Sequence, residues 1–230
     1  VGLKGTDGKE VLEKARQLGA YPEAPEKAKK ALKILISLID QIEIITCPGS
    51  MGEDEATQLG FKSIIIGDRK TNVGPEDTEE AASKMLEMGV DLLLFAGGDG
   101  TARNIYNVIG DKLPAIGIPA GVKIHSAVYA NHPRSAGEVA LKYLKGELKT
   151  IREAEVMDID EEAYREGQVT AKLYGYMKVP YERQLVQSLK AGRPEQEESA
   201  RKSIADRIVS EMEPDIFYII GSGTSTRPIM

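Results

Sequence analysis

Residues 92–105 read LLLFAGGDGTARNI, and this stretch decides the fold. It opens with an apolar run, continues through a turn that contains three glycines, and ends in residues with helical spacing of apolar side chains. A buried strand that passes through a tight turn into a helix is typical of parallel sheets. We therefore expect a buried strand over 90–96 and a helix over 102–109.

The same alternation of apolar strands and helices extends outward on both sides of this stretch. We expect further strands over 42–46, 63–66 and 115–119, and helices over 25–40, 53–60 and 135–145, with another helix that Asp77 or Thr78 caps. Near-continuous apolar strands joined by helices predict a doubly wound, Rossmann-like α/β domain over residues 1–148. In such sheets, ligands bind beyond the carboxyl ends of the strands.

The pattern changes after residue 150. Residues 151–160 and 168–179 have the partial alternation of longer strands, 195–213 form a strongly charged helical stretch, and 215–220 form another apolar run typical of a strand. The last ten residues, 221–230, read GSGTSTRPIM and have a pattern typical of the start of a helix. We expect a β-rich second domain over 149–230, which is incomplete, so that the chain is part of a longer protein.

Composition narrows the class of protein. The chain of 230 residues has a formal net charge of −6, whereas proteins that coat nucleic acid usually carry a basic excess. No apolar run approaches the roughly 20 residues that are needed to cross a membrane. The single cysteine, Cys47, excludes an internal disulfide and a cysteine-based zinc site, and it indicates a reducing compartment. We expect a cytoplasmic protein with no nucleic-acid or membrane partner.

The turn Gly97-Gly98-Asp99-Gly100-Thr101 is the strongest chemical signal. Glycines let the backbone approach a ligand closely or adopt conformations barred to other residues, and free amides at the start of a helix favour negative charge. Thr101 adds a hydroxyl. A carboxylate repels phosphate, so Asp99 suits this place if it holds a magnesium ion or accepts a proton from an attacking hydroxyl. A plain turn with an Asp cap is the alternative.

These residues resemble a known superfamily. GGDGT at a strand-to-helix junction is similar to the signature that NAD kinases share with diacylglycerol and sphingosine kinases and with phosphofructokinases. Further stretches resemble the AcoX-like branch of predicted ATP-NAD kinases, namely VGLKGTDG at 1–8, GPEDTEEAA at 74–82, LLLFAGGDGTARNI at 92–105 and GIPAGVKIHSAVYANHP at 117–133. The resemblance implies catalysis by Asp99, which also contacts the ribose of NAD, with Gly97, Gly98, Gly100 and Thr101 beside it.

The same resemblance implies the ligands. We expect NAD and ATP to bind, with ATP or polyphosphate as the phosphoryl donor and Mg2+ or another divalent cation to neutralise charge. Asp99 is the possible magnesium ligand. The family also implies homo-oligomers, either dimers or tetramers.

A second loop, at 221–227, follows the apolar run 215–220 and combines four hydroxyls with a cation, a composition that suits phosphate. It looks like the later Gly-Ser-Thr loop of NAD kinases, although Arg227 and Pro228 stand where those enzymes usually carry an aromatic residue. A polar helix-capping turn is the alternative. The candidate binding residues in this loop are Ser222, Gly223, Thr224, Ser225, Thr226 and Arg227.

A third loop, at 119–126, follows the fourth expected strand, at the same edge of the sheet as GGDGT. Lys123 could contact phosphate and His125 a ribose or base, although a lone His or Lys is more often structural or solvated. Asp77 and Thr78 are further candidates, because the resemblance places their helix start near the site. Capping of that helix also explains both residues.

Three functions stay open. The first is transfer of phosphate to the 2′-hydroxyl of NAD. The second is a kinase of another small-molecule or lipid hydroxyl, although no amphipathic basic helix offers a membrane face. The third is a regulatory protein that binds nucleotide without turnover. One feature supports it: no asparagine precedes Asp158, Asp160, Glu161 and Glu162, where NAD kinases carry an Asn-Glu/Asp pair for the nicotinamide nucleotide. The retention of Asp99 speaks against it.

Two other enzyme classes are disfavoured. A dehydrogenase needs Gly-x-Gly-x-x-Gly after its first strand, and no such motif follows a strand here. A Ser/His/Asp hydrolase is disfavoured because the chain has only two histidines and no Gly-x-Ser-x-Gly.

Overall fold

The structure, a computed structural model, describes residues 9–121, 124–159, 171–187, 194–213, 215–221 and 226–229. The chain forms two compact units, Val1–Ser188 and Leu189–Met230, and each is described by itself. Within the described ranges, no helix is both long enough and apolar enough to cross a membrane.

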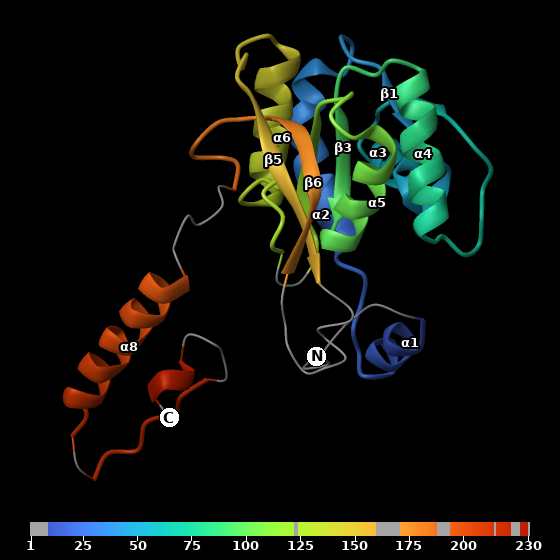
Figure 1. The fold of residues 1–230 in the computed structure, drawn as a ribbon. Coiled ribbons are helices and arrows are strands. Elements are labelled where there is room, and N and C mark those ends of the chain that lie inside the picture. The colour runs from blue at the N-terminus through green and yellow to red at the C-terminus, as the bar shows by residue number, and fades with distance from the viewer. Residues whose placement is uncertain are drawn as a thin grey trace. The chain divides into compact units, whose positions relative to one another are not determined.

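Two parallel strand pairs lie in the first unit (Figure 1). Strand β1 (Ile44–Thr46) pairs with β2 (Ser63–Ile65), and β3 (Leu93–Gly97) pairs with β4 (Ala115–Pro119). Strand β4 has the predicted bounds, and its first four residues are buried. Parallel strands that alternate with helices confirm the predicted Rossmann-like α/β fold.

The helices of this unit are α1 (Lys9–Gln17), α2 (Ala24–Leu35), α3 (Glu53–Gln58), α4 (Pro75–Glu87), α5 (Asp99–Ile109) and α6 (Pro133–Leu144). Short 3₁₀ turns cover Ile36–Leu38 and Gly49–Met51. Proline stands in the first turn of α2, α4 and α6, where its missing N–H costs no helical hydrogen bond.

The predicted capping residues of α4 are corrected by the structure. The helix begins at Pro75, so Gly74 is the residue before its first turn and Asp77 is the third residue inside it. Asp77 Oδ2 accepts a hydrogen bond of 2.7 Å from Gly74 N. The carboxylate therefore satisfies a backbone amide from within the first turn.

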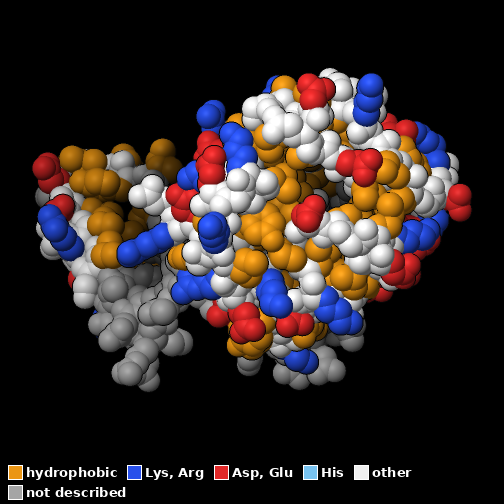
Figure 2. Space-filling model, turned by 90° about the horizontal axis from the view of Figure 1, so that it is seen from above, with side chains coloured by type: hydrophobic (Ala, Val, Ile, Leu, Met, Phe, Trp, Pro, Cys, Tyr) orange, Lys and Arg blue, Asp and Glu red, His pale blue; other side chains and the backbone are white. Residues whose placement is uncertain are grey.

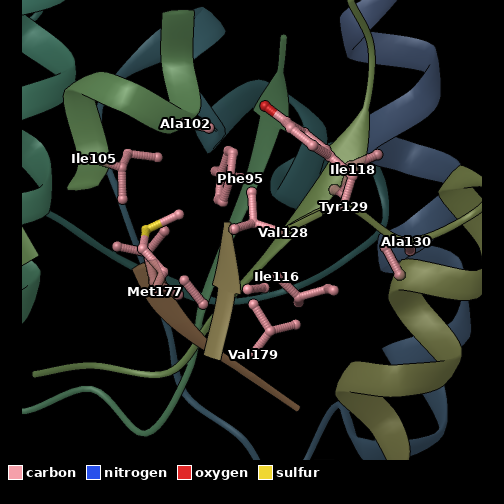
Figure 3. Packing of buried hydrophobic residues seen from close by; sticks show 14 of the residues in the cluster. Phe95, Ala102, Ile105, Ile116, Ile118, Val128, Tyr129, Ala130, Met177 and Val179 are labelled. Carbon is pink, nitrogen blue, oxygen red and sulfur yellow. The ribbon is translucent and has the colours of Figure 1, made fainter. Parts of the chain in front are cut away.

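One hydrophobic cluster joins the second strand pair to helices α5 and α6 (Figure 3). Ile116 and Ile118 of β4 and Ile105 and Ile109 of α5 are each at most 2% exposed. A smaller cluster, with Leu35 and Phe61 among its buried members, lies between α2 and α3. Because residues of both β3 and α5 are buried in the larger cluster, the turn that joins these two elements has a fixed position.

An antiparallel hairpin completes the first unit. It consists of β5 (Ile151–Ile159) and β6 (Ala171–Pro180), with a register shift between Val156 and Met157. In Figure 1 the hairpin lies beside the β3–β4 pair, and its alternate residues Val156, Met177 and Val179 are buried in the same cluster. The compact unit therefore extends to Ser188, whereas the expected domain boundary at 148/149 stays a prediction about the family's domains.

The second unit contains α8 (Pro194–Ser210), close to the predicted helix, and a 3₁₀ turn at Arg227–Ile229. The strand predicted over 215–220 is wrong, because the described residues 215–221 have no regular structure. Phe217 and Ile219 are fully exposed there. A strand needs a neighbour to accept and donate its backbone hydrogen bonds, and none of the described strands pairs with this segment.

Charged side chains of both signs are interspersed on the face of the molecule seen in Figure 2. Independently of that view, ion pairs form within one helix at a spacing of four residues, such as Lys84 with Glu80 in α4 and Arg134 with Glu138 in α6. Such exposed pairs stabilise a helix by only about 0.2–0.5 kcal/mol each.

Candidate functional site

Asp99 is the first residue of α5, directly after the carboxyl end of β3 and Gly98. Its side chain is only 8% exposed. The apolar run of β3 and the inner face of α5 are both held in the core, so the turn between them is a fixed point of the fold. The first backbone amides of a helix lack partners within the helix, and Asp99 stands among them.

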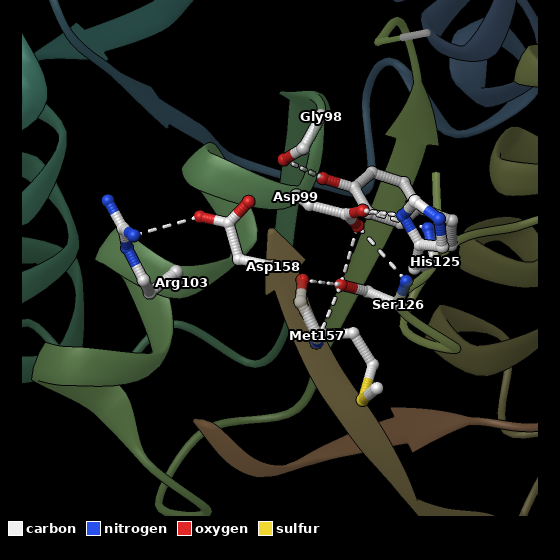
Figure 4. Close-up of polar contacts among 8 residues, drawn as sticks. Gly98, Asp99, Arg103, His125, Ser126, Met157 and Asp158 are labelled. Atoms are coloured by element: carbon white, nitrogen blue, oxygen red, sulfur yellow. Dashed lines mark hydrogen bonds and ion pairs between the residues drawn. The ribbon is translucent and has the colours of Figure 1, made fainter. Parts of the chain in front are cut away.

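Among the described residues, four groups contact the Asp99 carboxylate, all from the loop after β4 (Figure 4). Oδ2 accepts a hydrogen bond of 2.8 Å from His125 N and lies 3.1 Å from His125 Nδ1. Oδ1 accepts hydrogen bonds from Ser126 N at 3.0 Å and from Ser126 Oγ at 2.7 Å. The structure thus brings together two predicted site residues, Asp99 and His125, from loops that follow neighbouring strands.

Ser126 links this arrangement to the hairpin. Its side chain is fully buried, and its hydroxyl lies 2.8 Å from Met157 O while accepting a hydrogen bond of 2.9 Å from Met157 N. Ala127 N also donates to Glu155 O of β5. Strand β5 therefore fixes the loop that surrounds Asp99.

Two glycines let the loops after β3 and β4 meet backbone to backbone. A Cβ atom added to Gly121 would lie 2.6 Å from Gly98 Cα, and Gly121 N donates to Gly97 O at 2.9 Å. The φ of Gly98 is −119°, a value that other residues also adopt. Glycine at position 98 is explained by the close approach of the Gly121 backbone, whereas the predicted close approach of a ligand stays a prediction.

The other residues of the turn have different surroundings. A Cβ on Gly97 would lie 2.4 Å from Thr101 Oγ1, so Gly97 makes room for the Thr101 side chain. A Cβ on Gly100 would meet only Asp158 Oδ2, at 3.9 Å. Gly100 is therefore the one member of the turn where an added methyl group meets no crowding.

Tyr129 is a site residue that the sequence analysis missed. It is fully buried, its hydroxyl donates to Gly98 O at 2.5 Å, and its ring packs edge to face on Phe95 with centroids 5.5 Å apart. Burial raises the pKa of the Tyr129 phenol well above its ordinary value, and the charges of Asp99 and Asp158 raise it further. A buried tyrosine next to a glycine-rich turn has no sequence signal beyond its place after the loop at 119–126.

Asp158 and Arg103 form a second polar pair beside Asp99 (Figure 4). Arg103 Nη1 lies 2.9 Å from Asp158 Oδ2, and the guanidinium stands 5.4 Å from the ring centroid of Tyr174. Arg103 is one helical turn after Asp99 on α5, and Asp158 comes from β5. Of the four acidic residues that the sequence analysis named between 158 and 162, Asp158 is the one that the structure describes, and it lies near the site. Arg103 was not singled out from the sequence.

Asp77 and Thr78 belong to a different part of the first unit. Asp77 pairs with Lys70, which together with the Gly74 amide lowers the pKa of the Asp77 carboxyl. Asp77 also lines a cavity of about 20 Å³ beside Cys47, room for about one water molecule. None of its described contacts reaches the groups around Asp99, so a binding role for Asp77 and Thr78 stays a prediction.

The remaining predicted residues lie in other places. Lys123 and Ser222, Gly223, Thr224 and Ser225 fall outside the described residues. Thr226 Oγ1 donates to Gly221 O at 2.7 Å, and Arg227 begins the 3₁₀ turn of the second unit. These contacts do not test whether Thr226 and Arg227 bind phosphate, so that role stays a prediction.

The described residues do not fit a magnesium site held by the protein alone. Among them, no three His, Cys, Asp or Glu residues come together in a way that could hold a metal ion. Both Asp99 oxygens already face hydrogen-bond donors. Magnesium in kinases is usually bound through substrate phosphates and water with few carboxylates, so a cation here would arrive with the phosphates.

Comparison with known proteins gives one match. Residues 18–148, more than half of the chain, match the family described as the ATP-NAD kinase N-terminal domain. The matched range includes both loops around Asp99 and ends before the hairpin. No curated protein and no solved structure matches the chain.

Proposed function

Because the chain belongs to the ATP-NAD kinase family, we propose that it transfers a phosphoryl group from ATP to the 2′-hydroxyl of NAD, forming NADP. The observation that carries the proposal is the buried Asp99 carboxylate at the start of α5, beyond the carboxyl end of β3. This is the edge at which parallel α/β sheets bind their ligands.

The surroundings of Asp99 suit phosphoryl transfer. Amides in the first turn of a helix favour phosphate, and Gly98 and Gly121 leave the backbone of this turn without side chains. Thr101 and Gly100 belong to the same turn and are proposed to contact the nucleotide. Such a reaction depends mainly on positioning and electrostatic stabilisation, which a fixed turn provides.

The proposal also covers the phosphoryl donor, the cation and the oligomeric state. ATP is the donor that the family favours, and polyphosphate is the alternative. Magnesium, when bound to the donor phosphates, would neutralise their charge. A homo-oligomer and phosphate contacts from Thr226 and Arg227 remain predictions.

The test compares NADP formation by the parent protein and by Asp99→Asn, with magnesium, ATP and NAD present. We expect the variant to lower kcat/KM at least about 100-fold, the scale of a lost acid–base group. Asp111→Asn is the matched control, because Asp111 is 64% exposed and lies 3.7 Å from Lys178.

Two results would contradict the proposal. If well-folded parent protein forms no NADP with ATP or with polyphosphate, NAD is not the acceptor, and other hydroxyl compounds must be tested in the same assay. If Asp99→Asn is as active as Asp111→Asn, the carboxylate at the start of α5 has no part in the reaction.

A further inference from the structure

Two cationic side chains lie near the glycine-rich turn and have no part in the function proposed above. The first is Arg103, four residues after Asp99 in α5, so that the two side chains share one face of the helix. Helical side chains lean toward the amino end, which brings Arg103 back toward the turn. Asp158 Oδ2 lies 2.9 Å from Arg103 Nη1 and 3.9 Å from the place that a Cβ on Gly100 would take (Figure 4).

The second cation, Lys172, comes from β6. It stands opposite Asp158 in the register of the hairpin, and opposite residues have their side chains on the same face. Tyr174, two residues further along the strand, shares that face. Lys172 Nζ lies 5.8 Å from the centroid of the Tyr174 ring, and Arg103 Cζ lies 5.4 Å from it. One aromatic ring thus gathers both cations beside the turn.

Both cations are accessible to a ligand. The side chain of Arg103 is 29% exposed and that of Asp158 is 12% exposed, while Lys172 is exposed. A guanidinium carries five donors in a fixed plane, so a pair with one carboxylate is compatible with a second anion. Asp158 and Tyr174 hold the guanidinium in place before a ligand arrives, which lowers the entropic cost of binding.

The charges around the turn favour such a role. Asp99 and Asp158 both act on the buried Tyr129, whose pKa they raise, so two negative charges lie close to the turn. Two carboxylates would repel a phosphate. Arg103 and Lys172 offset this repulsion, and their attraction acts on a charged substrate but not on an uncharged one.

We propose that Arg103 and Lys172 bind a phosphate group of the hydroxyl-bearing substrate, so that the acceptor is a phosphate-bearing compound such as a dinucleotide and not an uncharged alcohol. This inference rests on the proposed function. Arg103 supplies donors in a fixed orientation, and Lys172 adds a second positive charge. Both residues determine specificity and take no part in making or breaking bonds.

The kinetic test uses Lys172→Gln, with Lys178→Gln as the matched control. Lys178 lies on the same strand, is 43% exposed and stands 3.7 Å from Asp111. We expect Lys172→Gln to raise the KM for NAD about tenfold, the scale of a lost hydrogen bond to a charged group, with kcat and the KM for ATP nearly unchanged. Lys172→Arg keeps the charge and should stay close to the parent.

A comparison of acceptors tests the substrate class. Adenosine carries the same 2′-hydroxyl as the adenosine part of NAD but has no phosphate. The parent should prefer NAD to adenosine at least about 100-fold in kcat/KM, the scale of two lost charged contacts, and Lys172→Gln should reduce this preference about tenfold. A preference that Lys172→Gln leaves unchanged would overturn the proposal. So would a rise in the KM for ATP in place of that for NAD, because the two cations would then hold the donor.

A measurement of binding does not depend on turnover. Calorimetric titration of the full chain with NAD should show about tenfold weaker binding by Lys172→Gln than by the parent, and a smaller loss of affinity when salt is raised. Arg103→Gln should weaken binding at least as much, and its unfolding midpoint reports separately the loss of the ion pair with Asp158.

The titration separates this inference from the proposed function. If the parent forms no NADP but binds NAD about tenfold more tightly than Lys172→Gln, the proposed reaction fails and the phosphate site remains. Equal affinity of the parent and Lys172→Gln, or no binding of NAD by the parent, would overturn the phosphate site itself.

Discussion

Tyr129 joins the turn before α5 to the hydrophobic core. Its ring packs on Phe95 and against Gly117, where an added Cβ would lie 2.3 Å from the ring. Its hydroxyl donates to Gly98 O. One side chain thus fixes the backbone just before Asp99.

Replacing Tyr129 with phenylalanine should destabilise the fold. The ring still fills its space, but the partly buried Gly98 O loses its hydrogen bond, which costs about 1–3 kcal/mol in the free energy of unfolding. Urea unfolding measures the change, with Tyr176→Phe as the control, because Tyr176 is 45% exposed. Equal stability of the two variants would mean that the bond to Gly98 contributes nothing.

The same variant should change how stability depends on pH. The pKa of Tyr129 in the fold is well above 10, whereas an unfolded tyrosine ionises near pH 10. Above about pH 10 the unfolded chain has lost a proton that the folded protein keeps, so stability falls as pH rises, by up to about 1.4 kcal/mol per pH unit. Tyr129→Phe should lack this part of the decline.

Among single residues, those with reactive side chains were easier to predict than those that hold them in position. Asp99 and His125 were found because a carboxylate after glycines and a histidine in the next loop suggest function by type. Tyr129 and the role of Ser126 were not found, because their importance comes from contacts with residues about 30 positions away. Local patterns do not contain such contacts.

Among the elements, the loops after β3 and β4 depend on each other. Gly121 and Gly98 approach so closely that neither has room for a larger residue without displacement of the other loop. Both loops supply groups to the surroundings of Asp99. Their relative position is therefore a requirement for the site as well as for the packing.

Gly121→Ala and Gly100→Ala should have opposite effects on stability. The methyl group at 121 would lie 2.6 Å from Gly98 Cα, and crowding of this kind typically costs about 1–3 kcal/mol. At 100, within the first turn of α5, the methyl group meets only Asp158 Oδ2 at 3.9 Å, and alanine favours the helix by about 0.5–1 kcal/mol. Thermal unfolding of both variants measures the difference. A stable Gly121→Ala protein would show that the loops can separate freely.

How accurately a helix or strand was predicted depended on what surrounds it in the fold. Strand β4 was predicted with its correct bounds because its first four residues are buried and the whole strand lacks polar side chains. The start of α4 was placed three or four residues late, because Asp77 resembles a cap although it lies in the third position. The run 215–220 has a strand's composition but no described partner, and composition alone does not supply one.

On the scale of the whole chain, the hairpin β5–β6 belongs with the α/β unit that holds Asp99. Strand β5 contacts α5, and it supplies Met157 to the loop around the carboxylate. The family match ends at residue 148. The α/β unit therefore includes a segment beyond the matched range that its core requires.

A shortened chain that ends at Ser188 should fold, whereas one that ends at Leu148 should be much less stable. The second loses Val156, Met177 and Val179, each at most 2% exposed, and burying such a side chain stabilises by roughly 1.5–3 kcal/mol. Urea unfolding followed by circular dichroism measures both chains. A cooperative transition of equal midpoint in the two would show that the hairpin is dispensable.

The fold class was predictable from sequence because alternating strands and helices leave few possible arrangements. The sequence pattern changes after residue 150, which is why a domain boundary was expected at 148/149; that boundary stays a prediction, whereas the compact unit of the structure extends to Ser188. The buried face of the hairpin, with Ala154 and Val156 two residues apart, becomes informative only when its partner is known.

The Ser126 hydroxyl has a single hydrogen and two oxygens that compete for it, Asp99 Oδ1 and Met157 O. The hydrogen points to whichever oxygen is more negative, and an ionised carboxylate exceeds a peptide carbonyl. Met157 N in turn donates to the Ser126 oxygen. One buried hydroxyl is thus a shared joint between the carboxylate and β5, so that loss of this single oxygen in Ser126→Ala would leave groups on both sides without their partner.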